Sequence, residues 1–349
     1  MKRARVSKKR AQEKAKALAK PSFPPVAITG SGFKGMALLR WLENSPEFPR
    51  VVFLDYRKPT EVLKKTKFYR IDLTETLADV QLYEILAQEG IDTLVHTAMP
   101  ITPPRNMAWA HELLSVGSMY VCNAAAEAGV RKLILASTAD VYGAFPDNPT
   151  YLTENNPPRA GRSSKFLHDK IDAERQFQKY AAKYPDSVVT ILRPATILGP
   201  TIQSYKTRYL QRAFVPTVLG YDPLVQFIHE ADLFQAFQHA IRKDCPGIFN
   251  LASKGVIPLS RGIKLMGKIP LPLSLLGLKS LIQTLWFLDI SPAPATHLDF
   301  LKYSCLVTYE RAEAVMGFQP RYNCKETLLE FVGAQRLRDI RLQQEALTT

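Results

Sequence analysis

The chain has 349 residues, 46% of them apolar and 22% charged, and a formal net charge of +14. This length and composition allow a large buried core and exclude the collagen-like, disordered and disulfide-framework classes of protein. The longest apolar stretch, residues 269–288, contains two prolines and a lysine, so we predict no membrane span. The cysteines form no C-x-x-C pair, which predicts reduced thiols, a cytoplasmic location and no metal site. The four cysteines are Cys122, Cys245, Cys305 and Cys324.

The positive charge is concentrated at the N-terminus. Residues 1–20 contain nine Lys or Arg and a single acid, a net charge of +8, which leaves +6 for the rest of the chain. Prolines rather than an apolar segment follow, so no secretory signal is predicted. We predict a flexible, solvated tail over residues 1–24. The alternative is contact with an anionic membrane, which would make the protein membrane-peripheral. No aromatic residues interleave the basic run, so nucleic acid is not a predicted partner.

From residue 25 onward, short apolar runs alternate with segments of helical periodicity. This alternation predicts βαβ units and therefore an α/β fold with a doubly wound, mainly parallel sheet, the Rossmann fold. Two later pieces, 226–228 and 247–251, are predicted to return to this sheet. The other predicted strands are 26–28, 51–54, 68–71, 93–95, 132–137 and 188–192, and the predicted helices are 33–42 and about 108–128.

The chain therefore divides into a large domain and a smaller one. We predict that residues 25–198 with 226–253 form the Rossmann domain. Residues 199–225 with 254–335 are predicted to form a C-terminal substrate lobe over the carboxyl edge of the sheet, where open α/β sheets bind ligands. Residues 336–349 are predicted to form a C-terminal helix or tail.

A glycine-rich turn follows the first predicted strand. Gly30, Gly32 and Gly35 give the spacing G-x-G-x-x-G between a strand and a helix. Gly30 would permit the tight turn, Gly32 a close approach of a pyrophosphate, and Gly35 close packing of helix on strand. The free N–H groups at the helix start would hold the phosphate charge. The residues between these glycines, Ser31, Phe33 and Lys34, belong to the same predicted cofactor site.

Acidic residues after the second and third strands complete this predicted site. Asp55 stands 20 residues after Gly35, where a carboxylate can accept hydrogen bonds from ribose hydroxyls and repel a 2′-phosphate. We therefore predict NAD as cofactor in preference to NADP, although Arg57 and Lys58 would tolerate that phosphate. Asp72 is placed to reach the adenine amino group, with Leu73 packing against the ring.

With these pieces in order, the chain resembles the extended short-chain dehydrogenase/reductase family, in its NAD-dependent epimerase/dehydratase group. The resemblance covers roughly residues 25–332 and implies cofactor contacts from Thr97, Ala98, Pro194 and Lys170, the last with the nicotinamide ribose. The segments that carry it are "LVHTAMP" at 94–100, "AGVRKLILASTADVYG" at 128–143, "KIDAE" at 170–174, "TILRPATILGP" at 190–200, "FIHEADL" at 227–233, "GIFNLAS" at 247–253 and "YSCLVTYERAEAVMGFQPRY" at 303–322.

The resemblance implies a Tyr-x-x-x-Lys pair on one helix face and a Ser or Thr after the fifth strand. In this chain the hydroxyl position is Thr138 and the lysine is Lys170, but the tyrosine position is Phe166. Phenylalanine has no ionisable proton. Two functions therefore stay open: an oxidoreductase that uses another proton donor, and a dinucleotide-binding sensor or scaffold that has lost turnover.

Two further departures bear on cofactor and substrate. "TGSGFKG" is one residue shorter than the turn that family members often carry, which affects the path of the phosphate loop. Val225-Gln226 replace the Arg-Asp that nucleotide-sugar epimerases commonly have. A small-molecule substrate is predicted, either a nucleotide-sugar or a lipid-like compound, and a homodimer stays open.

Four other side chains lie near the predicted site. His168 is predicted to lie on the surface or to pack against a helix, and His96 to be structural beside the cofactor. Tyr142 and Tyr151 are candidate proton donors. The segment 274–288 projects as a helix with one broad apolar face. We predict core packing for that face; the alternatives are an apolar mouth for a lipid-like substrate and a helix lying on a membrane surface.

Overall fold

A computed structural model describes residues 22–160, 164–288, 290–291 and 294–348, with side chains up to residue 338. The predictions for residues 1–21 lie outside the described residues. Packed structure begins slightly before the expected boundary, because the Phe23 ring stacks on Phe48 with 4.7 Å between centroids. In addition, the Phe23 N–H donates to the carbonyl of Glu47 at 2.8 Å.

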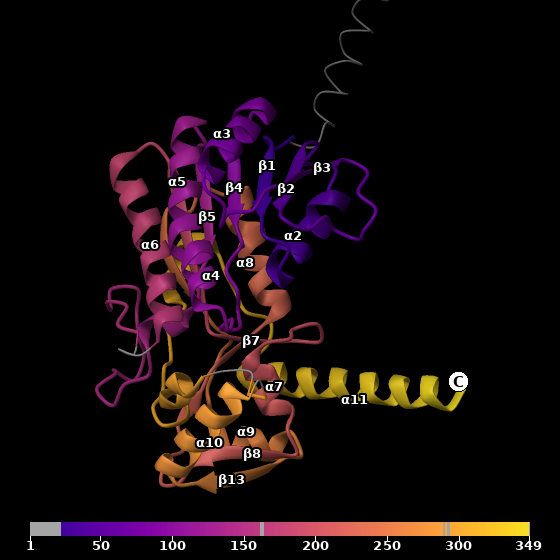
Figure 1. The fold of residues 1–349 in the computed structure, drawn as a ribbon, viewed down its shortest axis with the longest axis vertical. Coiled ribbons are helices and arrows are strands. Elements are labelled where there is room, and N and C mark those ends of the chain that lie inside the picture. The colour runs from indigo at the N-terminus through magenta and orange to yellow at the C-terminus, as the bar shows by residue number, and fades with distance from the viewer. Residues whose placement is uncertain (1–21, 161–163, 289, 292–293, 349) are drawn as a thin grey trace, which may run out of the picture.

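The predicted doubly wound fold is confirmed. Seven parallel strands form the central sheet in the order β11-β6-β5-β4-β1-β2-β3 (Figure 1). The chain order reverses between β1 and β4, which is where open sheets of this kind bind ligands. The strands are β1 Val26–Thr29, β2 Val51–Asp55, β3 Thr66–Arg70, β4 Thr93–His96, β5 Lys132–Ala136, β6 Val188–Pro194 and β11 Gly247–Leu251.

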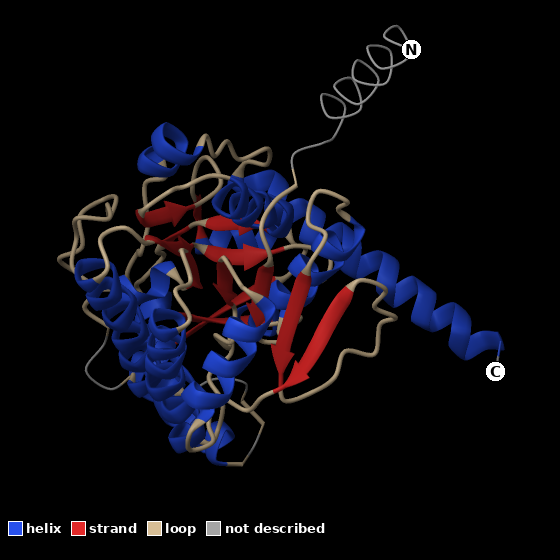
Figure 2. Cartoon of the chain, turned by 90° about the horizontal axis from the view of Figure 1, so that it is seen from above, coloured by secondary structure: helices blue, strands red, loops and turns tan. Residues whose placement is uncertain are grey.

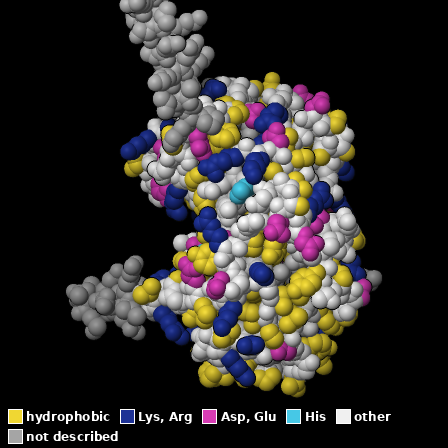
Figure 3. Space-filling model, turned by 180° about the vertical axis from the view of Figure 1, so that it is seen from behind, with side chains coloured by type: hydrophobic (Ala, Val, Ile, Leu, Met, Phe, Trp, Pro, Cys, Tyr) yellow, Lys and Arg dark blue, Asp and Glu magenta, His cyan; other side chains and the backbone are white. Residues whose placement is uncertain are grey.

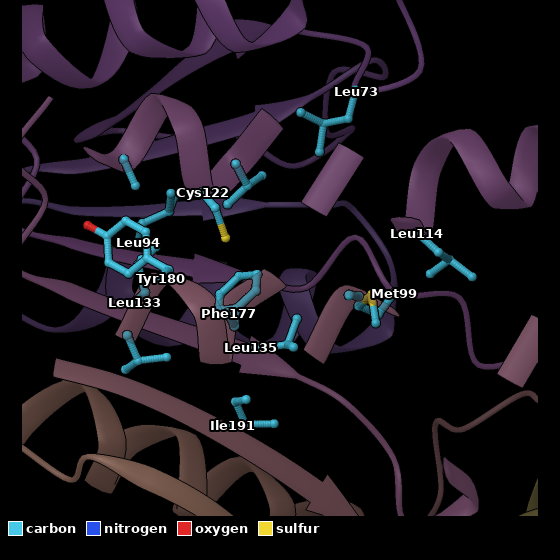
Figure 4. Close-up of a cluster of buried hydrophobic side chains, with 14 of the residues drawn as sticks. Leu73, Leu94, Met99, Leu114, Cys122, Leu133, Leu135, Phe177, Tyr180 and Ile191 are labelled. Atoms are coloured by element: carbon cyan, nitrogen blue, oxygen red, sulfur yellow. The ribbon is translucent and has the colours of Figure 1, made fainter. Parts of the chain in front are cut away.

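Helices cover both faces of the sheet, as Figure 2 shows from above. On one face α3, α5 and α6 enclose an apolar core that includes Leu94, Leu133, Phe177 and Ile191 (Figure 4). On the other face α2 and α8 enclose a second core. These helices are α2 Phe33–Asn44, α3 Ala78–Glu89, α5 Gly117–Glu127, α6 Lys165–Lys183 and α8 Glu230–Arg242.

One helix prediction differs from the structure, and two helices that cover the sheet, α3 and α8, were not predicted. The helix expected at about 108–128 is divided into α4 Met107–His111, a π-helical turn Glu112–Val116, and α5. Gly117 lies at this junction, and a Cβ there would be 3.2 Å from the Cβ of Leu73. The division thus falls where the helix lies closest to the loop after β3.

One strand prediction was wrong. Only 247–251, as β11, joins the main sheet. Residues 227–229 form β10, Phe227–His229, which pairs with β7, Thr196–Leu198, in a separate two-stranded sheet. The reason is the length of the neighbouring strands. β11 ends at Leu251, opposite Pro194, while the chain continues beyond Pro194 into β7, whose open edge then accepts β10.

The C-terminal elements build a lobe below the sheet, with cores of its own. Its ribbons are the parallel pair β8 Phe214–Val218 with β13 Ile269–Leu273 and the antiparallel pair β9 Leu224–Val225 with β12 Ile257–Pro258. Its helices are α7 Tyr205–Gln211, α9 Leu259–Leu265, α10 Leu275–Phe287, a 3-10 turn Ala295–Leu301, and α11 Cys324–Thr348. Between them in sequence, a π-helical turn Ala312–Met316 returns to the main sheet and packs in the core that α2 and α8 cover.

The lobe has an unusually apolar exterior. Figure 3 shows hydrophobic side chains gathered over its surface. Leu276 and Phe287 on α10 are 80% and 86% exposed, and Leu219 and Ile269 are also exposed. Within the part of the chain that the structure describes, no helix combines the length and apolarity that crossing a bilayer requires.

Candidate functional site

The glycine turn has the geometry expected of a phosphate loop. Gly30 has φ +97°, and a Cβ there would lie 2.6 Å from the Cα of Ala98; a Cβ on Gly35 would lie 1.8 Å from the carbonyl oxygen of Gly30. Both positions therefore require glycine for packing. A Cβ on Gly32 would meet nothing within 4 Å. Gly32 thus borders open space at the start of α2, where no side chain caps the helix.

Loops from β2, β3 and β4 surround this turn. Asp55 is 8% exposed and accepts hydrogen bonds from the N–H groups of Ser31 at 2.5 Å and Arg57 at 2.9 Å. The Thr97 hydroxyl donates to the carbonyl of Thr29 at 2.8 Å, which ties β4 to β1 below the turn. Each Asp55 oxygen retains acceptor capacity, since a carboxylate oxygen has two lone pairs.

The loop after β3 lies beside Asp55, because the Ile71 N–H donates to the Asp55 carbonyl at 3.1 Å. The Asp72 carboxylate accepts from the N–H and hydroxyl of Thr74 at 2.9 and 2.7 Å. Leu73 is buried and packs on α5. The structure thus brings the predicted adenosine-side residues to one end of the carboxyl edge.

At the other end, the predicted catalytic residues line one cavity. Thr138 follows β5 and accepts a hydrogen bond from the Asp140 N–H at 3.2 Å. Phe166 and Lys170 come from the first two turns of α6, and Pro194 ends β6. The cavity is lined by Ile101, Ser137, Thr138, Asp140, Phe166, Leu167, Lys170, Pro194, Ala195, Thr196, Ile197, Ile202, Ser204, Tyr205 and Lys206.

Two buried lysines lie near each other at this cavity, Lys170 in its lining and Lys34 beneath the glycine turn. Lys170 is 2% exposed, and its Nζ lies 4.8 Å from the ring centroid of Phe166. Burial lowers the pKa of Lys170 to about 8, against the opposing attraction of Asp140. Lys34 reaches under the turn and donates to the Ala136 carbonyl at 3.0 Å. Its pKa is well below the usual value, first because of burial and second because Lys170 is near.

Neither tyrosine proposed from the sequence lines this cavity. Tyr142 belongs to a buried network: its hydroxyl accepts from Arg193 at 2.7 Å and donates to Asn250 at 2.9 Å. Tyr151 is 42% exposed and contributes to neither this cavity nor the neighbouring one in the lobe. His168 is exposed, as predicted.

Sequence reasoning missed a group of polar residues contributed by the lobe. Tyr205 on α7 lines the cavity with a buried hydroxyl that has no hydrogen-bond partner, and burial raises its pKa well above the usual value. The Nζ of Lys206 lies 2.7 Å from the Asp140 carboxylate and 3.0 Å from the Thr196 hydroxyl. The Tyr-Lys dipeptide at 205–206 was the available signal, but it lies beyond Pro200, in the segment predicted to belong to the lobe.

His96 is structural. It is fully buried, its Nδ1 lies 2.6 Å from the Thr29 hydroxyl, its Nε2 lies 3.3 Å from the Ser118 hydroxyl, and its ring stacks on Phe177. Burial, and secondarily the charge of Lys34, lowers its pKa from 6.5 to about 3.

The lowered pKa of His96 leads us to predict that the stability of the fold depends on pH. Because its folded pKa is depressed, the unfolded chain binds the proton first. The contribution of His96 to stability is complete above pH 6.5 and is lost as the pH falls toward 3, by at most about 1.4 kcal/mol per pH unit. Urea unfolding between pH 7 and 4 should show that the free energy of unfolding falls less for His96→Gln than for the native chain. His168→Gln changes an exposed histidine and is the control: its free energy of unfolding should fall with pH as steeply as that of the native chain. If the free energy of unfolding falls equally steeply for all three proteins, His96 is not the group responsible.

No group of His, Cys, Asp or Glu side chains among the described residues is arranged to hold a metal ion. The four cysteines are all free thiols.

The fold and site together define a doubly wound α/β protein with a phosphate-type glycine turn and a polar cavity on the same sheet edge. Residues 26–252 match the NAD dependent epimerase/dehydratase family, and the chain belongs to that family. An uncharacterized protein of Mycobacterium tuberculosis is 30% identical over 337 residues, which is 92% of this chain and 86% of the relative. The dTDP-D-glucose 4,6-dehydratase of Mus musculus is 27% identical over 252 residues, 65% of this chain and 68% of the relative.

Solved structures show the same fold. MoeE5 in complex with UDP-glucuronic acid and NAD superimposes with a TM-score of 0.69 at 22% identity, covering 90% of this chain and 99% of that one. The UDP-glucose 4-epimerase of Thermotoga maritima with UDP-glucose superimposes with a TM-score of 0.67 at 18% identity, and the match covers 90% of this chain and 99% of that one.

Proposed function

We propose that this protein is an NAD-dependent oxidoreductase of the epimerase/dehydratase family that acts on a hydroxyl- or carbonyl-bearing small molecule. One observation carries the proposal: Thr138, Lys170 and Pro194 line a single cavity on the same sheet edge as the glycine turn. The open space at Gly32, the uncapped start of α2 and the Asp55 carboxylate fit a dinucleotide lying along that edge.

In this proposal the chain's own residues position the cofactor and substrate. NAD, when bound, accepts or supplies the hydride. Lys170 holds the nicotinamide ribose, and at neutral pH it is mostly an ammonium, since its pKa is about 8. The Thr138 hydroxyl accepts from a backbone N–H and is free to donate its own hydrogen to the substrate oxygen.

The proton donor we propose is Tyr205. Phe166 supplies no proton, and the hydroxyl of Tyr142 is engaged by Arg193 and Asn250. Tyr205 lines the same cavity as Lys170, and its hydroxyl has no partner. A phenol is protonated at neutral pH, so the hydroxyl can give its proton to a carbonyl oxygen as the hydride reaches the carbonyl carbon. The tyrosine then regains a proton from water.

One observation favours the second candidate function, a dinucleotide-binding sensor or scaffold. Phe166 is 4% exposed and contacts the Lys170 ammonium, so the position of the family's acid/base is filled by an apolar ring. A dinucleotide-binding sensor or scaffold without turnover would need no proton at this point.

The cofactor part of the proposal is tested at Asp55. The native protein should bind NAD(H) more tightly than NADP(H), because the carboxylate repels a 2′-phosphate. Asp55→Asn, which keeps the shape, and Asp55→Ala should each weaken NAD(H) binding about tenfold, since hydrogen bonds to charged groups contribute about 1.5–3 kcal/mol. The same variants should narrow or reverse the preference between the cofactors.

Calorimetric titration of both cofactors measures this directly. Asp79→Ala removes a carboxylate from the start of α3 and is the matched control that should leave both affinities unchanged. Equal affinity of the native protein for NAD(H) and NADP(H) would reject the assigned role of Asp55.

A further inference from the structure

A second cavity of about 180 Å³ continues from the first into the C-terminal lobe. Five residues line both cavities, so a molecule in the lobe can place one end beside Lys170 and Thr138. The shared residues are Asp140, Ala195, Thr196, Tyr205 and Lys206.

Most of the side chains that line the lobe cavity are apolar. Helix α10 contributes one face, Leu278, Leu281, Ile282 and Leu285. The face of segment 274–288 that we predicted to pack in the core thus borders this cavity, and of its residues only Leu278 is buried. The remaining apolar and aromatic lining comes from Ala139, Tyr209, Leu210, Pro216, Leu224, Val225, Phe227, Leu259, Pro294, Leu298, Phe300, Leu301, Tyr303 and Cys305.

Apart from the exposed Arg212, the charged and hydrogen-bonding side chains of this lining are either paired or close to Tyr205. The Gln226 side chain donates to the Val307 carbonyl at 3.1 Å and accepts from the Val307 N–H at 2.9 Å. Lys206 is paired with Asp140. The buried atoms without a partner are the Tyr205 hydroxyl and Nε2 of His297, whose ring is 5.1 Å from that of Tyr205. Burial lowers the His297 pKa to about 4, so the ring is neutral at pH 7.

From these observations we propose that the substrate is a small alcohol or ketone with an apolar body. The body, a ring or a branched chain, occupies the lobe cavity, and the oxygen lies at the inner end beside Tyr205. This inference rests on the proposed function and names its substrate class.

Size and desolvation both favour this class. A cavity of about 150 Å³ lined by Leu, Ile and Phe binds benzene, so 180 Å³ accommodates a ring of that size or slightly larger. A diphosphate group would lose its hydration in the apolar lining and would find Lys206 already paired. The other cation of the lining, Arg212, is exposed and therefore lies toward solvent.

The test measures the binding of two kinds of probe to the full chain, by calorimetry and by ligand-observed NMR. Benzyl alcohol and cyclohexanone represent the proposed class, and UDP-glucose represents nucleotide-sugars. We expect both apolar probes to bind and UDP-glucose not to bind. Leu281→Gln should weaken the binding of the apolar probes severalfold, because it replaces part of the apolar wall of the cavity with an amide that would lose hydration beside the probe. Leu281 is 46% exposed, so the substitution should not disturb folding.

Leu276→Gln is the matched control, because Leu276 lies on the same helix, is 80% exposed and does not line the cavity. It should leave the affinity for the apolar probes unchanged. The inference is overturned if UDP-glucose binds and the apolar probes do not, if neither class binds, or if the two variants lose affinity equally. NAD(H) titration of the same samples separates this result from a failure of the proposed function, which would remove cofactor binding and leave probe binding intact.

Discussion

Arg193→Met should destabilise the protein by about 3–5 kcal/mol, because it leaves the carboxylate of Glu174 buried without its partner. Both side chains are 1% exposed. Nε of Arg193 donates to the two carboxylate oxygens at 3.0 Å each, and its terminal nitrogens reach Glu174 at 2.5 Å and the Tyr142 hydroxyl at 2.7 Å. The Ser137 hydroxyl donates to the same carboxylate. Urea unfolding monitored by circular dichroism measures the loss.

A surface pair provides the matched control. Arg175 and Asp172 lie 2.8 Å apart on the same helix, with side chains 64% and 39% exposed. Arg175→Met should cost well under 1 kcal/mol, as is usual for exposed pairs. The double variant Glu174→Leu with Arg193→Met removes both buried charges and should be more stable than Arg193→Met alone. A loss below about 1 kcal/mol for Arg193→Met would show that the pair is not buried in solution.

This network also bears on the active cavity. Ser137 precedes Thr138, and Glu174 lies one helical turn after Lys170, so the ion pair fastens α6 to β5 and β6 directly behind the cavity. Tyr142 completes the network through Asn250 on β11. A tyrosine with these partners holds strands together, which explains why its position near the cleft misled the sequence-based reading.

What the sequence predicts well is local. The turn at Gly30, Gly32 and Gly35 lies within one strand–helix connection, so spacing alone indicates the close approach of Gly35 to the Gly30 carbonyl. The alternation of apolar runs likewise predicted the parallel sheet, since its strands are buried on both faces.

What the sequence did not predict depends on contacts between distant segments. Tyr205 joins the cavity only because the start of α7 lies against the loop after β4, where its N–H donates to the Thr102 hydroxyl, more than 100 residues away in sequence. The pairing of β10 with β7 depends on where β11 ends, at Leu251, and no local pattern at 226–228 records that. The burial of Lys34 depends on the Ala136 carbonyl of another strand.

Two substitutions in the cavity should identify the proton donor: one removes the hydroxyl of Tyr205, and the other adds a hydroxyl at Phe166. Tyr205→Phe should lower the rate of cyclohexanone reduction by NADH about 10²–10⁴-fold, the usual contribution of general acid catalysis. Phe166→Tyr introduced into that variant should recover part of the rate, because the new hydroxyl lies one helical turn from the Lys170 ammonium, which lowers the pKa of a neighbouring phenol. Absorbance of NADH follows both steps.

Controls distinguish this result from loss of the fold or of the cofactor. Phe166→Leu keeps an apolar side chain and should recover nothing, while Lys170→Ala should weaken NAD(H) binding whichever tyrosine is present. If the native chain has no turnover and Phe166→Tyr alone creates it, the protein is the sensor or scaffold and Tyr205 is not its donor. If Tyr205→Phe leaves a measurable native rate unchanged, Tyr205 is likewise excluded. Recovery that also requires Lys170 would place the acid, the lysine and the substrate oxygen in the one cavity that Thr138, Phe166 and Tyr205 line.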